Sequence, residues 1–176
     1  MKTEYILNRE VDLILAVLTP ANRLVMRVAL HTGLRIGDVL ALKSAQLQPH
    51  FWVTEQKTGK RRQVGLPKPL LEDLKNTAGR VWVFEGRDPK KPRTRQAVWK
   101  DVKRAAKAFR LPANIAPHSA RKNYAAELLQ RYGDLEKVRR ALNHSNDAVT
   151  IIYALADLQR QAKDRRRAAR RGGKKS

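Results

Sequence analysis

The sequence contains no cysteine, few acidic residues and no long apolar run. The lack of cysteine excludes disulfide bonds, thiol nucleophiles and cysteine-based zinc sites. No apolar stretch approaches the ~18 residues that a membrane-spanning helix needs. The first ten residues also lack the apolar segment and the small-residue cleavage site of a secretory signal. These absences argue against secretion and against a membrane span.

Basic residues are abundant: 38 Lys and Arg face 16 Asp and Glu, which gives the 176-residue chain a formal net charge of +22. Such an excess favours a polyanionic partner, with nucleic acid first and an acidic membrane surface second. Residues 157–176 hold nine basic and two acidic residues, so most of the excess lies in residues 1–156. We expect one domain over 1–156 and a basic, flexible tail over 157–176 that adds phosphate affinity without sequence preference. A merely solubilising tail is the alternative.

Apolar periodicity predicts a mainly helical fold with one small antiparallel sheet, an α+β class. Thr58–Gly59–Lys60 has the composition of a hairpin turn between two strands. The predicted helices are 8–18, 21–31, 36–42, 67–74, 94–109, 118–132, 135–142 and 146–153, and the predicted strands are 51–54, 61–66 and 81–84. The three tryptophans, Trp52, Trp82 and Trp99, are interpreted as core residues rather than as platforms for stacking bases.

Several enzyme classes lack their signature in this sequence. No glycine-rich phosphate loop is present, and no serine lies on a nucleophile elbow. The four histidines, at 31, 50, 118 and 144, form no pair four residues apart on a helix, which disfavours a zinc site. We therefore expect neither a metal ion nor a cofactor.

A set of polar side chains falls at breaks between predicted elements, where segments distant in sequence can converge on one anion. Arg35 is expected at the start of a short helix, and Lys57 lies beside the hairpin turn. His118 and Arg121 are three residues apart on one helix and share a face. The full set is Arg35, Lys57, His118, Arg121, His144 and Tyr153.

The segments that contain these residues resemble the catalytic domain of the tyrosine recombinases, the phage integrase family. In the family's order they are Thr-Gly-Leu-Arg-Ile-Gly-Asp (32–38), Lys-Thr-Gly-Lys-Arg-Arg-Gln-Val-Gly-Leu-Pro (57–67), Pro-His-Ser-Ala-Arg (117–121) and Leu-Asn-His-Ser followed by Thr150 and Tyr153. Each motif is weak alone, but four in order at matching intervals are specific. The resemblance covers about residues 8–156 and implies the tyrosine recombinase catalytic-domain fold.

The resemblance implies a site-specific recombinase or integrase that cleaves and rejoins DNA strands. The Tyr153 hydroxyl attacks a phosphodiester, forms a 3′-phosphotyrosyl link and leaves a free 5′-hydroxyl. The charge that develops on the phosphoryl oxygens needs stabilisation, and the planar donor forks of Arg35 and Arg121 suit that role. Because this guanidinium pair replaces a magnesium clamp, no metal is required.

The remaining members of the set are expected to transfer protons or to hydrogen-bond the phosphate. Lys57 is the expected general acid for the departing 5′-oxygen, and the neighbouring Lys60, Arg61 and Arg62 are its rivals. His118 is the expected base or proton shuttle for the tyrosine hydroxyl, and His144 is expected to hydrogen-bond the phosphate.

Further basic residues of the hairpin and of the 93–100 segment are expected to contact DNA. The candidates are Lys60, Arg61, Arg62, Arg93, Arg95, Lys100 and Lys122. The resemblance implies double-stranded DNA as the partner and a tetramer on two duplexes. We expect a monomer without DNA, no membrane or small-molecule partner, and a location in the cytoplasm, with the nucleoid or in a host cell.

The sequence departs from the family in places. Asn143 stands where glycine is usual, and asparagine tolerates the left-handed conformation, so the turn is expected to survive. Ala120 is smaller than the usual leucine, and Leu155 stands where many members have histidine. Only 34 residues precede Arg35, so we expect either a catalytic domain separated from an N-terminal DNA-gripping domain or a minimal member.

Other functions stay open. They are a catalytically inert DNA-binding regulator of the same fold, DNA relaxation of the type IB topoisomerase kind, and RNA or ribosome binding driven by charge. Within the first motif, Asp38 is interpreted either as a residue that orients Arg35 or as a solvated helix residue.

Overall fold

The computed structural model describes residues 8–111, 115–143 and 151. The chain divides into two units, residues 1–124 and 125–176. In the described part of the chain the fold is mainly helical with one two-stranded antiparallel sheet, which confirms the predicted α+β class. The predicted boundary between a domain and a tail after residue 156 lies outside the described residues and stays a prediction.

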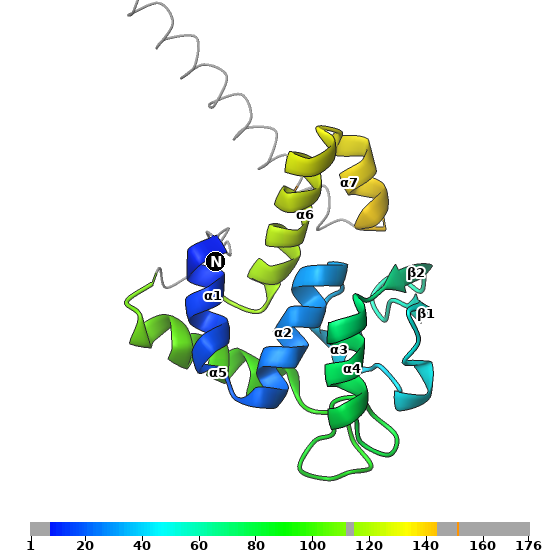
Figure 1. Ribbon diagram of the computed structural model, residues 1–176, viewed down its shortest axis with the longest axis vertical. Helices are drawn as coiled ribbons and strands as arrows, with labels where there is room; N and C mark the ends of the chain where they lie inside the picture. The colour runs from blue at the N-terminus through cyan, green and yellow to red at the C-terminus, as the bar shows by residue number, and fades with distance from the viewer. Residues whose placement is uncertain (1–7, 112–114, 144–150, 152–176) are drawn as a thin grey trace, which may run out of the picture. The chain divides into compact units, whose positions relative to one another are not determined.

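The first unit begins with α1 (Asn8–Val17), α2 (Pro20–Thr32) and α3 (Ile36–Leu40). Pro20 occupies the first turn of α2, where its fixed φ suits the helix and its missing N–H breaks no bond. In Figure 1, α2 lies between α1 and α5 on one side and α3 and α4 on the other, and it packs against all four. This helix therefore carries the centre of the first unit's core.

Gly33 ends α2 in the left-handed conformation, with φ of 64°. Glycine adopts this conformation without steric cost. A Cβ atom at this position would lie 2.2 Å from Cδ1 of Tyr124. Two independent constraints, backbone conformation and a packed ring, therefore require glycine here, two residues before the first motif's arginine.

The predicted hairpin is confirmed as β1 (His50–Thr54) and β2 (Arg61–Gly65), which pair antiparallel with Phe51 opposite Val64. Side chains alternate along β1, so that Phe51 is buried and Trp52 is exposed. The connecting loop uses Gly59 at φ of 66°. A one-turn 3-10 helix, η1 (Ser44–Gln46), precedes the hairpin.

Two further helices follow in the first unit, α4 (Lys68–Thr77) and α5 (Arg95–Ala108). The hydroxyl of Thr94 accepts a hydrogen bond from Ala97 N and caps α5, so the helix begins one residue later than the predicted range of 94–109. The buried residues of α4 are three leucines, Leu70, Leu71 and Leu74. The helices predicted over 67–74 and 94–109 are thus confirmed.

The predicted strand over residues 81–84 is wrong. In the described part of the chain, Trp82 forms only an isolated antiparallel bridge with Lys43. The partner segment turns into η1 immediately after Lys43, so no ladder can extend. Val83 and Phe84 are nevertheless buried, and the apolar run serves the core rather than a sheet.

The tryptophans are not core residues, contrary to the prediction. Trp52 is 52% exposed and Trp99 is 48% exposed, while Trp82 is half-buried with Lys43 Nζ 3.1 Å from its ring centroid. Trp52 lies on the outward face of β1, and Trp99 follows Val98, which takes the inward position on α5. The rings of Trp52 and Trp99 are therefore partly exposed to solvent, each with a basic side chain over it.

α6 (His118–Tyr132) belongs to the first unit as far as Tyr124 and to the second from Ala125 on. It is followed by α7 (Leu135–Ala141), whose N-cap Asp134 accepts hydrogen bonds from two backbone amides. Asn143 follows with φ of 59°, so the prediction that asparagine supports the turn in place of glycine is confirmed. Of the predicted helix 146–153, only residue 151 is described, and it is helical. Among the helices that the structure describes, none is long and apolar enough to cross a bilayer.

Candidate active site

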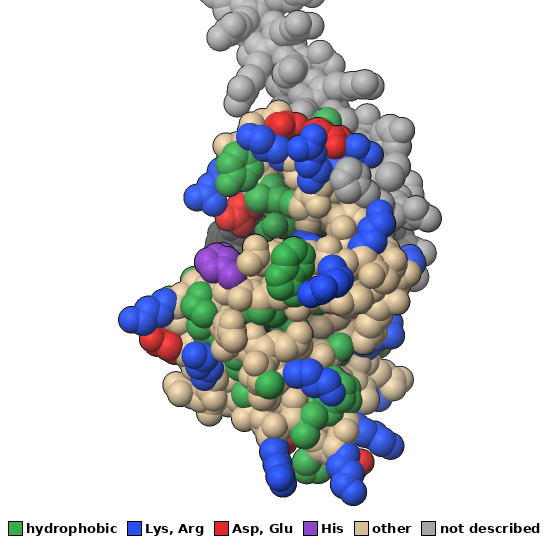
Figure 2. Space-filling view, turned by 90° about the vertical axis from the view of Figure 1, so that its right-hand side faces the viewer, with side chains coloured by type: hydrophobic (Ala, Val, Ile, Leu, Met, Phe, Trp, Pro, Cys, Tyr) green, Lys and Arg blue, Asp and Glu red, His purple; other side chains and the backbone are tan. Residues whose placement is uncertain are grey.

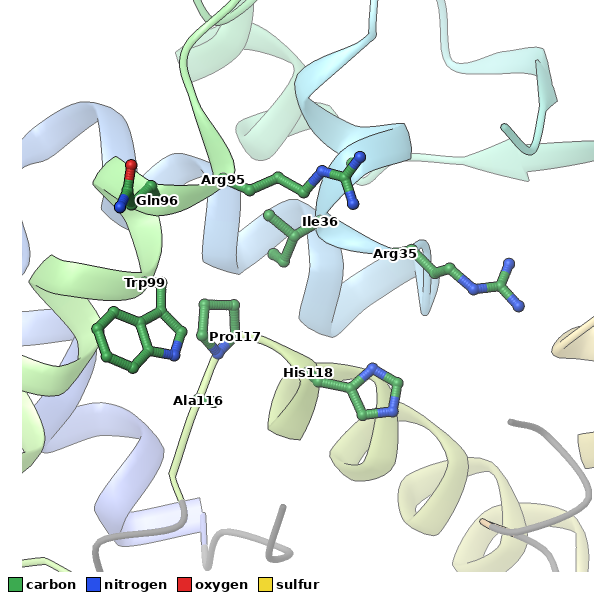
Figure 3. A pocket seen from close by; sticks show the side chains of 9 residues that line it. Arg35, Ile36, Arg95, Gln96, Trp99, Ala116, Pro117 and His118 are labelled. Atoms are coloured by element: carbon green, nitrogen blue, oxygen red, sulfur yellow. The ribbon is translucent and has the colours of Figure 1, made fainter. Parts of the chain in front are cut away.

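A cavity of about 560 Å³ in the first unit brings two predicted site residues together. Arg35 comes from the start of α3 and His118 from the start of α6, and in Figure 3 both side chains extend to the same side of the cavity. Trp99 and Arg95 of α5 line another part of its wall. The complete lining is Arg35, Ile36, Gly37, Arg95, Gln96, Trp99, Ala116, Pro117 and His118.

The local sequence explains why Arg35 faces this cavity. Gly33 reverses the chain after α2, and the side chain of Leu34 is buried at 1% exposure. Arg35 then adopts extended backbone angles as the N-cap of α3, and its carbonyl accepts hydrogen bonds from the amides of Asp38 and Val39. A buried anchor on one side and a helix start on the other therefore fix the arginine backbone.

Glu55, at the end of β1, is the partner that sequence reasoning missed. Its side chain is fully buried, and it forms an ion pair with Arg35. Its second oxygen lies 3.5 Å from Nε of Arg62. A signal was present in the sequence, since Glu55 is the one acidic residue in the otherwise basic hairpin segment, but nothing local showed that it was buried.

Arg62 lies mostly inside the protein. Its side chain is 12% exposed, and Nη2 donates a 2.7 Å hydrogen bond to the carbonyl of Thr32. Burial lowers the pKa of the Arg62 guanidinium, against the field of nearby Glu55, which raises it. Arg62 is therefore mostly buried and bonded within the protein, and its contact with DNA stays a prediction.

Arg121 is buried at 1% exposure, and its guanidinium donates to the carbonyl oxygen of Gly33. His118, one turn earlier on α6, borders the cavity. Burial raises the pKa of Asp38, and the charges of Arg35 and Arg121 both oppose this rise, so the two arginines act on one carboxyl group. The structure thus brings the first and third motifs together.

Asp38 is buried at 3% exposure, which excludes the solvated alternative. Its Oδ1 accepts a 2.9 Å hydrogen bond from the backbone amide of Gln56. Burial raises the pKa of Asp38, helped by the charge of Glu55 and opposed by the Gln56 hydrogen bond and the two arginines. The carboxylate of Asp38 therefore connects α3 to the base of the hairpin loop at Gln56.

Lys57 follows Gln56 and is exposed on the hairpin loop. The amides of Thr58 and Gly59 both donate to the carbonyl of Glu55, which closes the loop around it. The loop is thus fixed at its base by Asp38 and Glu55, while the lysine itself extends into solvent.

The remaining DNA-contact candidates differ in exposure. Lys60, Arg61, Arg95 and Lys100 are exposed, whereas Arg93 and Lys122 are half-buried. Arg93 Nε donates a 2.6 Å hydrogen bond to Oδ1 of Asn22, and the Arg61 guanidinium lies 5.2 Å from the Trp52 ring centroid. Figure 2 shows one face of the molecule, on which Lys and Arg side chains are widely spread and Asp and Glu are few.

Two predicted catalytic residues, His144 and Tyr153, lie outside the described residues. Within the described ranges, no group of three or more His, Asp or Glu side chains is arranged to hold a metal ion. Four of the six predicted site residues therefore have positions, and three of them, Arg35, His118 and Arg121, come from the segments around one cavity.

Comparisons with known proteins show the family to which the chain belongs. The sequence matches the model of the phage integrase family over residues 4–160. It is 32% identical over 130 residues to the probable integrase/recombinase YoeC of Bacillus subtilis, which covers 70% of this chain and 71% of that protein. It is 27% identical over 142 residues to tyrosine recombinase XerA of Pyrococcus furiosus, which covers 75% of this chain and 49% of the relative.

Solved structures give the same fold. The XerH site-specific recombinase bound to palindromic difH substrate, in a post-cleavage complex, has a TM-score of 0.72 at 23% identity and covers 91% of this chain and 52% of that one. The catalytic domain of bacteriophage HP1 integrase has a TM-score of 0.66 at 22% identity and covers 87% of this chain and 88% of that one.

The chain spans about half the length of several curated relatives, including XerA. The family match itself extends over most of the chain and includes all four motifs. The chain therefore belongs to the phage integrase family, and its fold is that of tyrosine recombinase catalytic domains.

Proposed function

We propose that the chain cleaves and rejoins DNA strands at a specific site through a 3′-phosphotyrosyl intermediate at Tyr153. One observation carries the proposal: Arg35 and His118 border one cavity, while Arg121 is held against the carbonyl of Gly33, two residues before Arg35. Cationic and proton-transferring groups from separate elements thus gather around one volume, as an anionic phosphate requires.

The proposed chemical step is an in-line displacement at phosphorus. The oxygen of Tyr153 forms a bond to phosphorus while the bond to the 5′-oxygen breaks. The phenolic proton passes to His118, and the departing 5′-oxygen takes a proton from Lys57. Rejoining reverses these transfers, with a 5′-hydroxyl as the attacking group and tyrosine as the leaving group. Bond energy is conserved in the phosphotyrosine, so no nucleotide cofactor is needed.

The arginines stabilise the charge on the non-bridging oxygens. A guanidinium presents a planar fork of donors that matches two phosphate oxygens. Because Arg35 is fixed by Glu55 and Arg121 by Gly33, neither has to be ordered when the transition state forms. We propose that this pair does the work of a metal ion and that the reaction proceeds in a chelator.

Double-stranded DNA is the proposed substrate. The exposed residues Lys60, Arg61, Arg95 and Lys100 supply phosphate contacts, and the basic residues 157–176 add affinity that does not depend on sequence. A structure of λ integrase is described as a tetramer bound to a Holliday junction. By analogy we propose that this chain is a monomer alone and a tetramer on two duplexes.

Covalent trapping tests the proposal. The full chain is incubated, in EDTA, with a pool of randomised duplexes that carry a nick or a 5′-bridging phosphorothiolate, and covalent complexes are isolated. Wild type is expected to yield an adduct, and Tyr153→Phe is expected to yield none. An adduct with the Phe variant would assign the nucleophile to another residue, and DNA binding without any adduct would favour the inert regulator.

A further inference from the structure

The buried carboxylate of Glu55 connects the hairpin to the segment that carries Arg35. We propose that Glu55 is a positioning residue, which orients the Arg35 guanidinium along the cavity wall and fixes the base of the Lys57 loop beside α3. This inference rests on the proposed function, because it assigns Glu55 a part in the same DNA cleavage reaction.

The surroundings of Glu55 determine where its carboxylate lies. The side chain has 0% exposure, and a buried carboxylate without partners is costly. One oxygen pairs with Arg35 and also accepts a 3.3 Å hydrogen bond from the Thr58 hydroxyl, while the other faces Arg62 Nε at 3.5 Å. With a guanidinium on each side, the carboxylate has one favourable place, and Arg35 is fixed with it.

Arg62 closes a ring of contacts around this position. Its Nη2 donates to the carbonyl of Thr32 at 2.7 Å. The Thr32 hydroxyl donates to the carbonyl of Val28 at 2.7 Å and accepts the amide of Leu34 at 3.2 Å. The contacts therefore run from the end of α2 through Arg62 and Glu55 to Arg35, which lies three residues beyond Thr32.

A second contact fixes the same part of the hairpin. Asp38, on α3, accepts the amide of Gln56 at 2.9 Å, and Lys57 is the next residue. Glu55 and Asp38 thus hold two consecutive hairpin positions against the segment 35–38. Loss of Glu55 would leave one of these two attachments and would free Arg35 from its ion pair.

The positioning role makes a prediction that a purely structural role does not. A negative charge beside a phosphate-binding arginine opposes DNA binding, so its removal leaves affinity unchanged or raises it. Misplacement of reacting groups by about 1 Å is enough to slow a reaction by about a hundredfold. Removal of the Glu55 charge should therefore lower the cleavage rate while leaving DNA affinity intact.

The experiment compares Glu55→Gln with Asp73→Asn in the full chain. Asp73 forms an exposed ion pair with Arg27 between α2 and α4, so its variant is a control for the loss of a carboxylate. We expect Glu55→Gln to lower the adduct rate at saturating DNA by tenfold or more, with the DNA dissociation constant unchanged or lower. Glu55→Asp keeps the charge and is expected to recover part of the rate. The Glu55→Gln effect should shrink to less than twofold on an Arg35→Lys background.

The result that overturns the inference is a Glu55→Gln rate within twofold of the Asp73→Asn rate. A parallel loss of DNA affinity, rate and Tm, with no recovery in Glu55→Asp, would also overturn it and would assign Glu55 to folding alone. If Glu55→Gln does not fold, Glu55→Asp decides: a slower rate at unchanged affinity supports the inference, and a wild-type rate contradicts it. If wild type itself yields no adduct, the proposed function fails, an outcome distinct from those above.

Discussion

The guanidinium of Arg121 donates a hydrogen bond to the carbonyl oxygen of Gly33, 88 residues earlier in the chain. Gly33 ends α2 and lies two residues before Arg35. The contact therefore joins the motif on α6 to the motif on α3 and brings two arginines to one region of the first unit. Arg121 is fully buried and has little access to water, so the Gly33 carbonyl also supplies a hydrogen-bond acceptor that water would otherwise provide.

Replacement of Arg121 by lysine tests this contact. Lysine keeps the charge but lacks the planar fork, so it cannot contact the Gly33 carbonyl and a phosphate in the same geometry. We expect the adduct rate to fall by ~10²–10³, the range for loss of one oxyanion donor, and stability to fall by about 1–3 kcal/mol because a buried carbonyl loses its partner. Arg131→Lys, at an exposed position on α6, is the matched control. Equal rates for the two variants would contradict the role.

Replacement of Gly33 by alanine tests the turn before Arg35. Alanine at this φ costs about 1–2 kcal/mol, and its Cβ also collides with the Tyr124 ring. Gly59 has nearly the same φ but open space around it, so Gly59→Ala measures the backbone cost alone. We expect Gly33→Ala to lower the free energy of unfolding in urea by clearly more than Gly59→Ala does. Equal losses would show that the Tyr124 ring moves away at no cost.

The carboxylate of Asp101 links α5 to the start of α2 and should make stability depend on pH. Burial works to raise the pKa of Asp101, but hydrogen bonds from Asn22, Thr19 and Arg104 outweigh it and lower the pKa to about 2. A depressed pKa stabilises the folded state above the unfolded value of 3.8, and this contribution is lost as pH falls toward 2. At 1.36 kcal/mol per pKa unit it amounts to about 2 kcal/mol at neutral pH.

Asp101→Asn is therefore expected to lower the free energy of unfolding by about 2 kcal/mol at pH 7 and by much less at pH 2.5. Urea denaturation of the variant and of wild type at both values measures the difference. Asp73→Asn, at an exposed ion pair, serves as the control. A difference between Asp101→Asn and wild type that does not change with pH would contradict the account.

Arg61 and Arg62 are adjacent in sequence but are predicted to act differently. Arg61 is exposed over the Trp52 ring, so Arg61→Gln should weaken DNA binding and reduce the slope of log affinity against log salt by about 1. Arg62→Gln should lower Tm, because Glu55 then loses one of its two cationic partners in the interior. Salt-dependent fluorescence anisotropy and thermal unfolding separate the two effects. A larger salt effect for Arg62→Gln than for Arg61→Gln would reverse the assignment.

Local sequence features predicted most of the framework. Gly59 marked the hairpin turn, and Asn143 was expected to adopt the left-handed conformation that it has. Each of these signals acts over a few residues, through a backbone preference. Such features are readable without knowing the tertiary fold.

The errors arose where a distant segment decides the outcome. Glu55 is buried because Arg35, 20 residues earlier, and Arg62 on the neighbouring strand both face it. Trp52 is exposed because the neighbouring residues of β1, Phe51 and Val53, face the core. Trp82 is not part of a strand because the segment that pairs with it turns into η1 directly after Lys43. No local pattern carries this information. Predictions from charge and apolar spacing alone were therefore wrong for these side chains.

Identification of the residue that carries DNA in a trapped covalent complex tests the central claim most directly. The adduct is digested with protease and nuclease, and the modified peptide is sequenced by mass spectrometry. The account predicts a nucleotide attached through phosphate to Tyr153, with the 5′-end of the cleaved strand free. Attachment at Tyr124 or Tyr132, or a phosphate joined to the 5′-side of the break, would contradict it.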